Sequence, residues 1–102
     1  TMTVFLDGEI DHHNAPSVRE KTDGFAVSFA PEKMILDFSG VTFMDSSGIG
    51  LVMGRYKLVS GFGCSLEITG LSKHALRVMK LAGLDKIAKL SAKKEEKNNE
   101  TA

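Results

Sequence analysis

The chain has 102 residues, which is enough for one domain with its own buried core. Thirteen basic residues balance thirteen acidic ones, so no net charge draws the chain to nucleic acid or to an anionic membrane. The chain has a single cysteine, Cys64, which excludes an internal disulfide and suits a reducing compartment. Because the sequence also shows no signal-peptide pattern and no apolar run of membrane-spanning length, it indicates a cytoplasmic protein.

The N-terminal part of the chain predicts a strand followed by a helix. Residues 3–6 are apolar and β-branched, which is typical of a strand. Asn14 can then cap a helix, in whose first turn Pro16 is tolerated. Four residues of this helix recur with helical spacing and are predicted to form one buried stripe: Val18, Thr22, Phe25 and Phe29.

The middle of the chain repeats this pattern. Residues 34–38 predict a second, short apolar strand. A second helix is expected over residues 46–60, ended by Gly61 and Gly63. Its predicted buried stripe consists of Ile49, Val52, Met53, Tyr56 and Val59.

The C-terminal part predicts a third strand at residues 64–68 and a third helix capped by Ser72. A weak fourth strand is expected at residues 86–90. Alternating strands and helices of this kind indicate an α/β domain with a mainly parallel sheet. The inward-facing residues of the third helix should be Ala75, Val78, Met79 and Ala82.

The segment FMDSSGIG, residues 43–50, carries the most chemistry. It lies between a predicted strand and a helix N-terminus, where anions and ligands gather in α/β sheets. A nucleotide-binding loop is disfavoured, because no lysine follows the glycines and their spacing does not fit a dinucleotide fingerprint. Two interpretations remain open: Asp45 or Ser46 caps the helix, or a serine is phosphorylated where the helix dipole favours the added charge.

The outer face of the second predicted helix adds a second candidate feature. Leu51 and Leu58 lie opposite the buried stripe, with Gly54 between them and Ser47 beside them. Two leucines next to a candidate switch predict a docking surface for another protein.

Histidines and carboxylates near the end of the first strand are candidate metal ligands or catalysts. His12 and His13 are adjacent, so on a strand they point to opposite faces and do not easily share a metal ion. Asp7, Glu9 and Asp11 alternate, which predicts a solvated acidic rim suited to a basic partner. We therefore expect no metal and no cofactor at these positions.

Four segments resemble the sporulation anti-sigma factor antagonists of the STAS domain family: GEIDHH (8–13), FMDSSGIG (43–50), GRYK (54–57) and AGLDKI (82–87). The resemblance implies a STAS fold over residues 1–90, with a small mainly parallel or mixed sheet. Residues 91–102 would then be a polar, charged tail or a short solvated helix. Family members usually carry a further edge strand ahead of residues 3–6.

The resemblance also implies a function. Such a domain binds an anti-sigma factor that has serine kinase activity, and so releases a sigma factor. The kinase phosphorylates the first serine of DSSG, which is Ser46 here, and the complex dissociates. A phosphatase then removes the phosphate, so that the domain can bind again. Asp45 and Ser47 would lie in the partner-facing site, bordered by Asp11, His12 and His13. The chain would be a binding switch and not an enzyme.

Two alternatives stay open at this point. The first is a STAS domain with a different protein partner, such as a stress-response assembly or a transporter. The second is a receiver-like protein phosphorylated on Asp45, although the acidic pair that such sites need is only loosely supplied by TVFLDGE. Hydroxylamine separates phosphoaspartate from phosphoserine, because it cleaves only the acyl phosphate.

Overall fold

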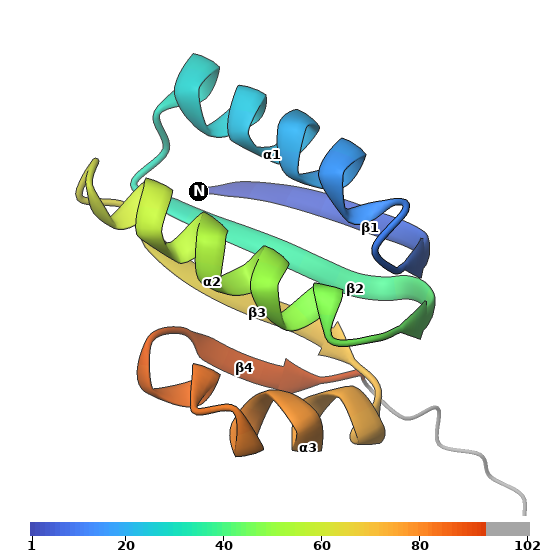
Figure 1. Cartoon of the computed structure of the whole chain (residues 1–102). Coiled ribbons are helices and arrows are strands. Elements are labelled where there is room, and N and C mark those ends of the chain that lie inside the picture. The colour runs from blue at the N-terminus through green and yellow to red at the C-terminus, as the bar shows by residue number, and fades with distance from the viewer. Residues whose placement is uncertain (94–102) are drawn as a thin grey trace, which may run out of the picture.

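Four parallel strands form one sheet in the order β1-β2-β3-β4, as the computed structural model shows for residues 1–93 (Figure 1). Because the strand order follows the chain and crossovers are right-handed, all helices lie on one face of the sheet. The predicted α/β alternation is therefore confirmed. The elements are β1 (Met2–Ile10), α1 (Ala15–Phe29), β2 (Lys33–Met44), α2 (Ser47–Ser60), β3 (Ser65–Leu71), α3 (Lys73–Leu81), the 3-10 helix η1 (Leu84–Lys86) and β4 (Lys89–Ala92).

The first two strands are longer than predicted. β1 continues through polar residues to Ile10, and β2 continues past residue 38 to Met44, because the two strands stay paired along their whole length. Two irregularities in the register, between Phe5 and Asp7 and between Gly8 and Glu9, interrupt the simple alternation that a short-strand prediction relies on. The longer pairing carries the ends of both strands to the same place.

The core lies between the sheet and the three helices. Alternate strand residues point toward the helices, whereas the opposite face of the sheet carries polar pairs such as Lys33 Nζ to Glu67 Oε1 at 2.6 Å. Burial raises the pKa of the Cys64 thiol, which keeps it protonated and unreactive. The largest fully buried side chains include Ile10, Met34, Leu36, Ile68, Leu71, Met79 and Leu84.

On that opposite face, Asp37 ties β2 to β3. Its carboxylate accepts hydrogen bonds from the Ser39 N–H at 2.8 Å and the Thr69 hydroxyl at 2.9 Å. Burial raises the pKa of Asp37, but these bonds outweigh it and hold the pKa below its ordinary value.

The stripe predicted for α1 is only partly correct. Thr22 is buried and Val18 half-buried, but Phe25 is 43% and Phe29 68% exposed, and Ala26 takes the inward position instead. The helix covers the edge of the sheet beside α2, which leaves its outer side to solvent (Figure 1).

The predicted N-cap of α1 is correct in position but lacks the capping bond. Asn14 occupies the N-cap position without a side-chain capping bond. Its amide instead donates to the Glu9 carbonyl at 3.2 Å, which ties the start of α1 back to β1.

The predicted inward face of α2 is only partly correct, although Ile49 and Tyr56 do pack half-buried against the core. Val52 and Val59 are buried as expected, but Met53 is 43% exposed, whereas Leu51 is only 4% exposed. Leu58 is half-buried against the core. Leu51 and Leu58 therefore do not form an exposed docking surface.

Two contacts explain why the inward face of α2 differs from the predicted one. Gly48 packs so closely on Met44 that an added Cβ would lie 2.4 Å from the Met44 side chain. Arg55 is buried between α2 and α1, where its Nε lies 2.6 Å from Asp23 Oδ1. Both positions look outward-facing by hydropathy, so a hydrophobic stripe could not place them.

The C-terminal part differs from its prediction mainly at the boundaries. Ser72 caps α3 as predicted, and its hydroxyl accepts from the Ala75 N–H at 3.0 Å. Ala75 and Met79 face inward, whereas Val78 is only half-buried and Ala82 is exposed. The last strand begins at residue 89, after η1, and includes residues 91–92 of the predicted tail; residues 94–102 lie outside the described part of the chain.

The orientation of α2 can be tested with one pair of charge substitutions. Leu51→Asp should lower the free energy of unfolding by more than about 3 kcal/mol, because it places a carboxylate in the core. Met53→Asp, on the same helix but exposed, should change it by no more than about 1 kcal/mol. Urea denaturation followed by circular dichroism measures both, and equal losses would contradict the orientation described here.

A second pair of substitutions tests the close approach at the start of α2. Ala has a higher helix propensity than Gly by about 1 kcal/mol, so Gly50→Ala, whose Cβ would meet nothing within 4 Å, should be neutral or stabilising. Gly48→Ala should be less stable than Gly50→Ala by about 1–3 kcal/mol, because Met44 must move. Equal stability of the two variants would show that Met44 repacks freely.

Candidate functional site

The segment FMDSSGIG lies where β2 ends and α2 begins. β2 ends at Met44, Ser46 is the N-cap residue and α2 begins at Ser47. The parallel register pairs Met44 with Ile10, and the Asp45 N–H donates to the Ile10 carbonyl at 3.2 Å. The turn that follows β1 therefore lies beside the DSSG segment, as expected for the carboxyl ends of neighbouring parallel strands.

Asp45 organises the first turn of α2, and the Ser46 side chain is left free. Asp45 Oδ1 accepts the Ser47 N–H at 2.7 Å. The Ser46 side chain is exposed and makes no hydrogen bond within residues 1–93. Of the two cap candidates in the sequence, Ser46 occupies the N-cap position without a side-chain bond, and Asp45, one residue earlier, supplies the side-chain bond to the helix. Ser46 thus presents an unengaged hydroxyl at the helix N-terminus.

Asp11 organises the neighbouring turn in the same way. Its Oδ1 accepts the His13 N–H at 3.0 Å and the Asn14 N–H at 2.9 Å, and its carbonyl accepts the Ala15 N–H at 2.8 Å. The Asn14 hydrogen bond, helped by His13 and His12, outweighs desolvation and holds the pKa of Asp11 below its ordinary value. The charged form of Asp11 therefore stabilises the turn.

The two histidines lie in this turn and not on a strand. Because β1 ends at Ile10, the expectation that His12 and His13 point to opposite faces is wrong. Their rings stack, with centroids 4.7 Å apart and an interplanar angle of 28°. Within residues 1–93, no three His, Cys, Asp or Glu side chains converge as a metal site would require.

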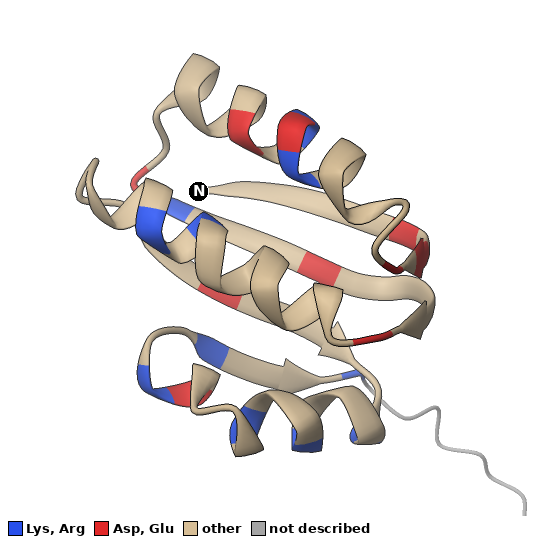
Figure 2. Cartoon of the chain, viewed as in Figure 1, with Lys and Arg blue, Asp and Glu red and all other residues tan. Residues whose placement is uncertain are grey.

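Acidic residues gather at this end of the molecule. Figure 2 shows Asp and Glu at the end of β1, in the following turn and before α2, whereas Lys and Arg concentrate on α3 and η1. Asp7 and Glu9 are exposed, and Asp11 and Asp45 are half-buried. This arrangement gives the region around Ser46 a locally negative character in a chain with no net charge.

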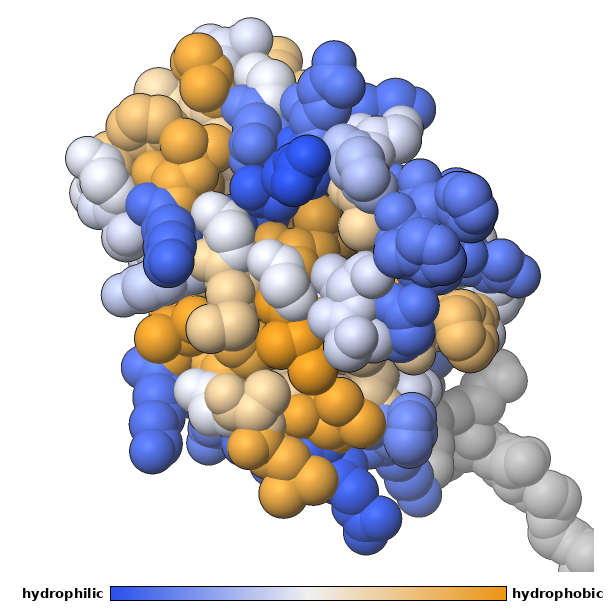
Figure 3. Space-filling view, in the orientation of Figure 1, coloured by the Kyte–Doolittle hydropathy of each residue, from blue (hydrophilic) through white to orange (hydrophobic). Residues whose placement is uncertain are grey.

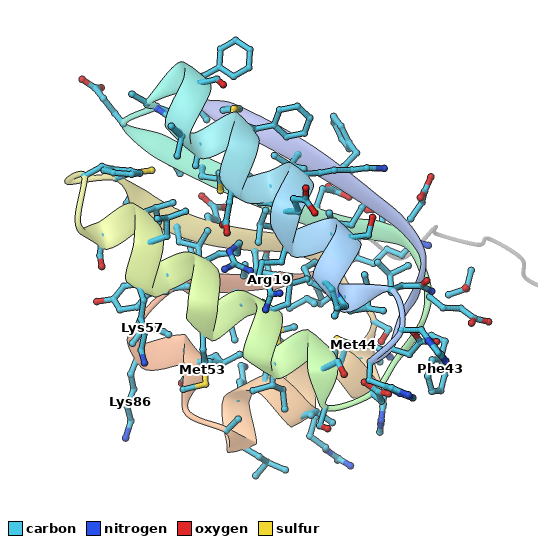
Figure 4. The ribbon with its side chains drawn as sticks, turned by 45° about the horizontal axis from the view of Figure 1, so that its top comes forward. Arg19, Phe43, Met44, Met53, Lys57 and Lys86 are labelled. Atoms are coloured by element: carbon cyan, nitrogen blue, oxygen red, sulfur yellow. The ribbon has the colours of Figure 1, made fainter. Side chains whose placement is uncertain are left out.

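An exposed phenylalanine accompanies the acidic residues, and the sequence had assigned no role to it. Phe43 is 52% exposed at the end of β2, and it points away from the body of the domain (Figure 4). It borders a hollow of about 250 Å³ between the end of β2 and the start of α3, which Met44 and His74 also line. Its position directly before MDSSG was the only signal in the sequence.

The structure thus brings together six of the eight predicted site residues. Asp11, His12, His13, Asp45, Ser46 and Ser47 lie around the paired ends of β1 and β2. Leu51 and Leu58 lie farther along α2, buried and half-buried. On the face shown in Figure 3, apolar surface lies toward α2 and α3, where Met53 and Leu81 are exposed, and over the end of α1, where Val27 and Phe29 are exposed.

A family model described as "STAS domain" matches residues 1–97 of the chain. An anti-sigma-B factor antagonist of Bacillus subtilis (strain 168) is 38% identical over 92 residues, covering 90% of this chain and 83% of that protein. An anti-sigma F factor antagonist of Paenibacillus polymyxa is 35% identical over 86 residues, covering 84% of this chain and 74% of that protein.

The fold has solved counterparts. The anti-sigma factor antagonist SpoIIAA in its unphosphorylated form is similar with a TM-score of 0.73 and 30% identity, covering 86% of this chain and 76% of that one. SpoIIAA in its phosphorylated form, called a Bacillus cell fate determinant, is similar with a TM-score of 0.67 and 30% identity. The match covers 86% of this chain and 79% of that one. No helix within residues 1–93 is long and apolar enough to cross a membrane. By sequence and by fold, the chain belongs to the STAS domain family.

Proposed function

We propose that this chain is an anti-sigma factor antagonist of the cytoplasm, a binding switch and not an enzyme. It binds an anti-sigma factor with serine kinase activity, which frees a sigma factor, and phosphorylation of Ser46 ends the binding until a phosphatase removes the phosphate. The observation that carries this proposal is the exposed, unengaged Ser46 hydroxyl at the junction of β2 and α2. The relatives named as antagonists, and SpoIIAA solved with and without phosphate, support it.

Ser46 is favoured over Ser47 by exposure. A kinase must enclose the acceptor hydroxyl, and Ser46 is exposed whereas Ser47 is half-buried with its N–H engaged by Asp45. Asp45 itself is a poor phosphoacceptor, because its carboxylate already holds the first turn of α2. The proposal therefore prefers phosphoserine to the phosphoaspartate of a receiver-like protein.

Hydrogen bonding at the start of α2 determines where a phosphate can go. The Ser47 N–H is held by the Asp45 carboxylate, the Gly48 N–H by the Asp45 carbonyl and the Ile49 N–H by the Ser46 carbonyl. Few helix N–H groups remain to receive a phosphate, so the group should project into solvent. Its about −1.5 to −2 charges would enlarge the negative region formed by Asp45 and Asp11.

This electrostatic arrangement accounts for a switch that acts from outside the fold. The acidic end of the unphosphorylated domain suits a basic surface on the partner. A phosphate on Ser46 adds bulk and charge at the centre of that contact, where the partner has to close. The complex should therefore weaken mainly through faster dissociation, since changes within one interface act mostly on the dissociation rate.

The acceptor assignment is tested with purified kinase and ATP. The wild-type chain should gain one phosphate, Ser46→Ala should gain none, and Ser47→Ala should still be phosphorylated. Intact-mass spectrometry measures this, and treatment with hydroxylamine should leave the phosphate in place. Loss of phosphorylation in Ser47→Ala alone, or release of phosphate by hydroxylamine, would contradict the assignment.

The mode of switching is tested by hydrogen exchange on the phosphorylated chain. Because α2 keeps its own hydrogen bonds, exchange over residues 47–60 and the melting temperature should stay close to those of the unmodified chain, while affinity for the anti-sigma factor falls. Ser46→Asp should reproduce the loss only partly, having a shorter side chain and about half the charge. Extensive new exchange across residues 47–60 would show that the phosphate acts by opening the fold.

A further inference from the structure

A hollow lies between α1 and α2, next to the start of α2. Its volume is about 360 Å³, and its lining includes His12, Arg19, Ser47 and Arg55. Gly50 and Gly54 form part of the α2 wall, and a Cβ added at either would meet nothing within 4 Å. Figure 4 shows the Arg19 side chain between the two helices. Two guanidinium groups therefore border an open space whose α2 wall is formed partly by glycines.

Arg55 is the unusual member of this lining. The residue is only 6% exposed, and its Nε lies 2.6 Å from Asp23 Oδ1. Its Nη1 is buried and finds no hydrogen-bond partner within residues 1–93, and the close Nε–Asp23 contact is an ion pair without well-aligned hydrogen-bond geometry. Buried donors are rarely left unpaired, because each forfeits the hydrogen bonds it would make in water. The orphaned Nη1 indicates an acceptor that residues 1–93 do not provide.

The charge balance around Arg55 points to an anion. Arg19 approaches closely enough to disfavour the charge on Arg55, and Asp23 is the carboxylate that pairs with Arg55. Burial lowers the pKa of Arg55, Asp23 raises it and Arg19 lowers it again, yet a guanidinium stays charged in proteins. Two cations thus share one carboxylate in a partly shielded space. The exposed Arg19 forms no ion pair within residues 1–93.

We propose that the hollow between α1 and α2 is an oxyanion-binding site. The oxygens of a phosphate or carboxylate accept hydrogen bonds from Arg55 Nη1 and from the Arg19 guanidinium, and the Ser47 hydroxyl lies in the same wall. Guanidinium groups suit such ligands because their planar array of donors matches two oxygens at once. The oxyanion comes either from solution or from an acidic side chain of a protein docked beside Ser46.

Titration of the free chain with inorganic phosphate tests the site without any partner protein. At constant ionic strength set with chloride, the amide resonances of Ser47, Gly50 and Gly54 and the Arg55 Nε–H resonance should shift saturably in NMR spectra. Acetate should act on the same resonances. Shifts that do not saturate, or that spread over the whole surface, would overturn the proposal.

Matched variants separate a defined site from general charge screening. Arg19→Gln should weaken phosphate binding by about tenfold, the usual worth of a hydrogen bond to a charged group. Arg77→Gln removes the same charge from exposed α3, and it should change binding less than about twofold. Arg55→Lys keeps a cation beside Asp23 but removes Nη1, and it should weaken binding while the chain stays folded. Equal effects of Arg19→Gln and Arg77→Gln would refute the site.

A competition experiment identifies the source of the oxyanion. Affinity for the anti-sigma factor is measured in phosphate and in chloride at equal ionic strength. If phosphate competes and Arg19→Gln weakens the complex, an acidic side chain of the partner occupies the hollow. If the complex is unaffected while the free chain still binds phosphate, the ligand is a free oxyanion. Failure of the complex to form would count against the proposed function alone, since the titration uses only this chain.

Discussion

The parallel pairing of β1 with the long strand β2 is the constraint on which the geometry around the DSSG segment depends. The pairing runs from Met2 with Met34 to Ile10 with Met44, and it carries the two strands to a common end. There the Asp45 N–H bonds to the Ile10 carbonyl, so the turn after β1 and the start of α2 are held at a fixed spacing. A shorter pairing would leave Ser46 on an independent loop.

Two carboxylates accept backbone N–H groups and so fix the two turns at this end of the domain. Asp11 receives N–H groups of its own turn, and Asp45 receives the first N–H of α2. Both residues looked like partner contacts in the sequence, and each has a structural role as well. The Ser46 side chain, by contrast, is fixed in position by its backbone and stays free of bonds. A free hydroxyl on a rigid support is what the proposed switch, which leaves the fold unchanged, requires.

The sequence was informative where the pattern is local and less so where tertiary contacts decide. The order of strands and helices, the Ser72 cap and the position of DSSG at a strand end follow from local chemistry, and they were predicted. The inward face of α2 was not, because it includes Gly48 and Arg55, which no hydrophobic stripe would select. The predicted strands were too short for a related reason, because polar residues of β1 stay paired with β2 through an irregular register.

The phenylalanines of α1 and the pair formed by Arg55 and Asp23 illustrate the same limit. Phe25 has the right spacing for a core residue but faces solvent, because α1 covers an edge of the sheet and not its middle. Which helix covers an edge depends on the strand order, and helical periodicity does not contain that information. The importance of Arg55 likewise becomes visible only when Asp23 of another helix is placed beside it.

The sequential strand order has a consequence for how the molecule forms. Each strand pairs with the strand that precedes it in the chain, so the sheet can grow in the direction of synthesis without waiting for a distant segment. The pair β1–β2 and the bond between Asp45 and Ile10 need only the first half of the chain. A nascent chain can therefore fix the backbone around Ser46 early, and β3 and β4 then extend a sheet whose DSSG end is already in place.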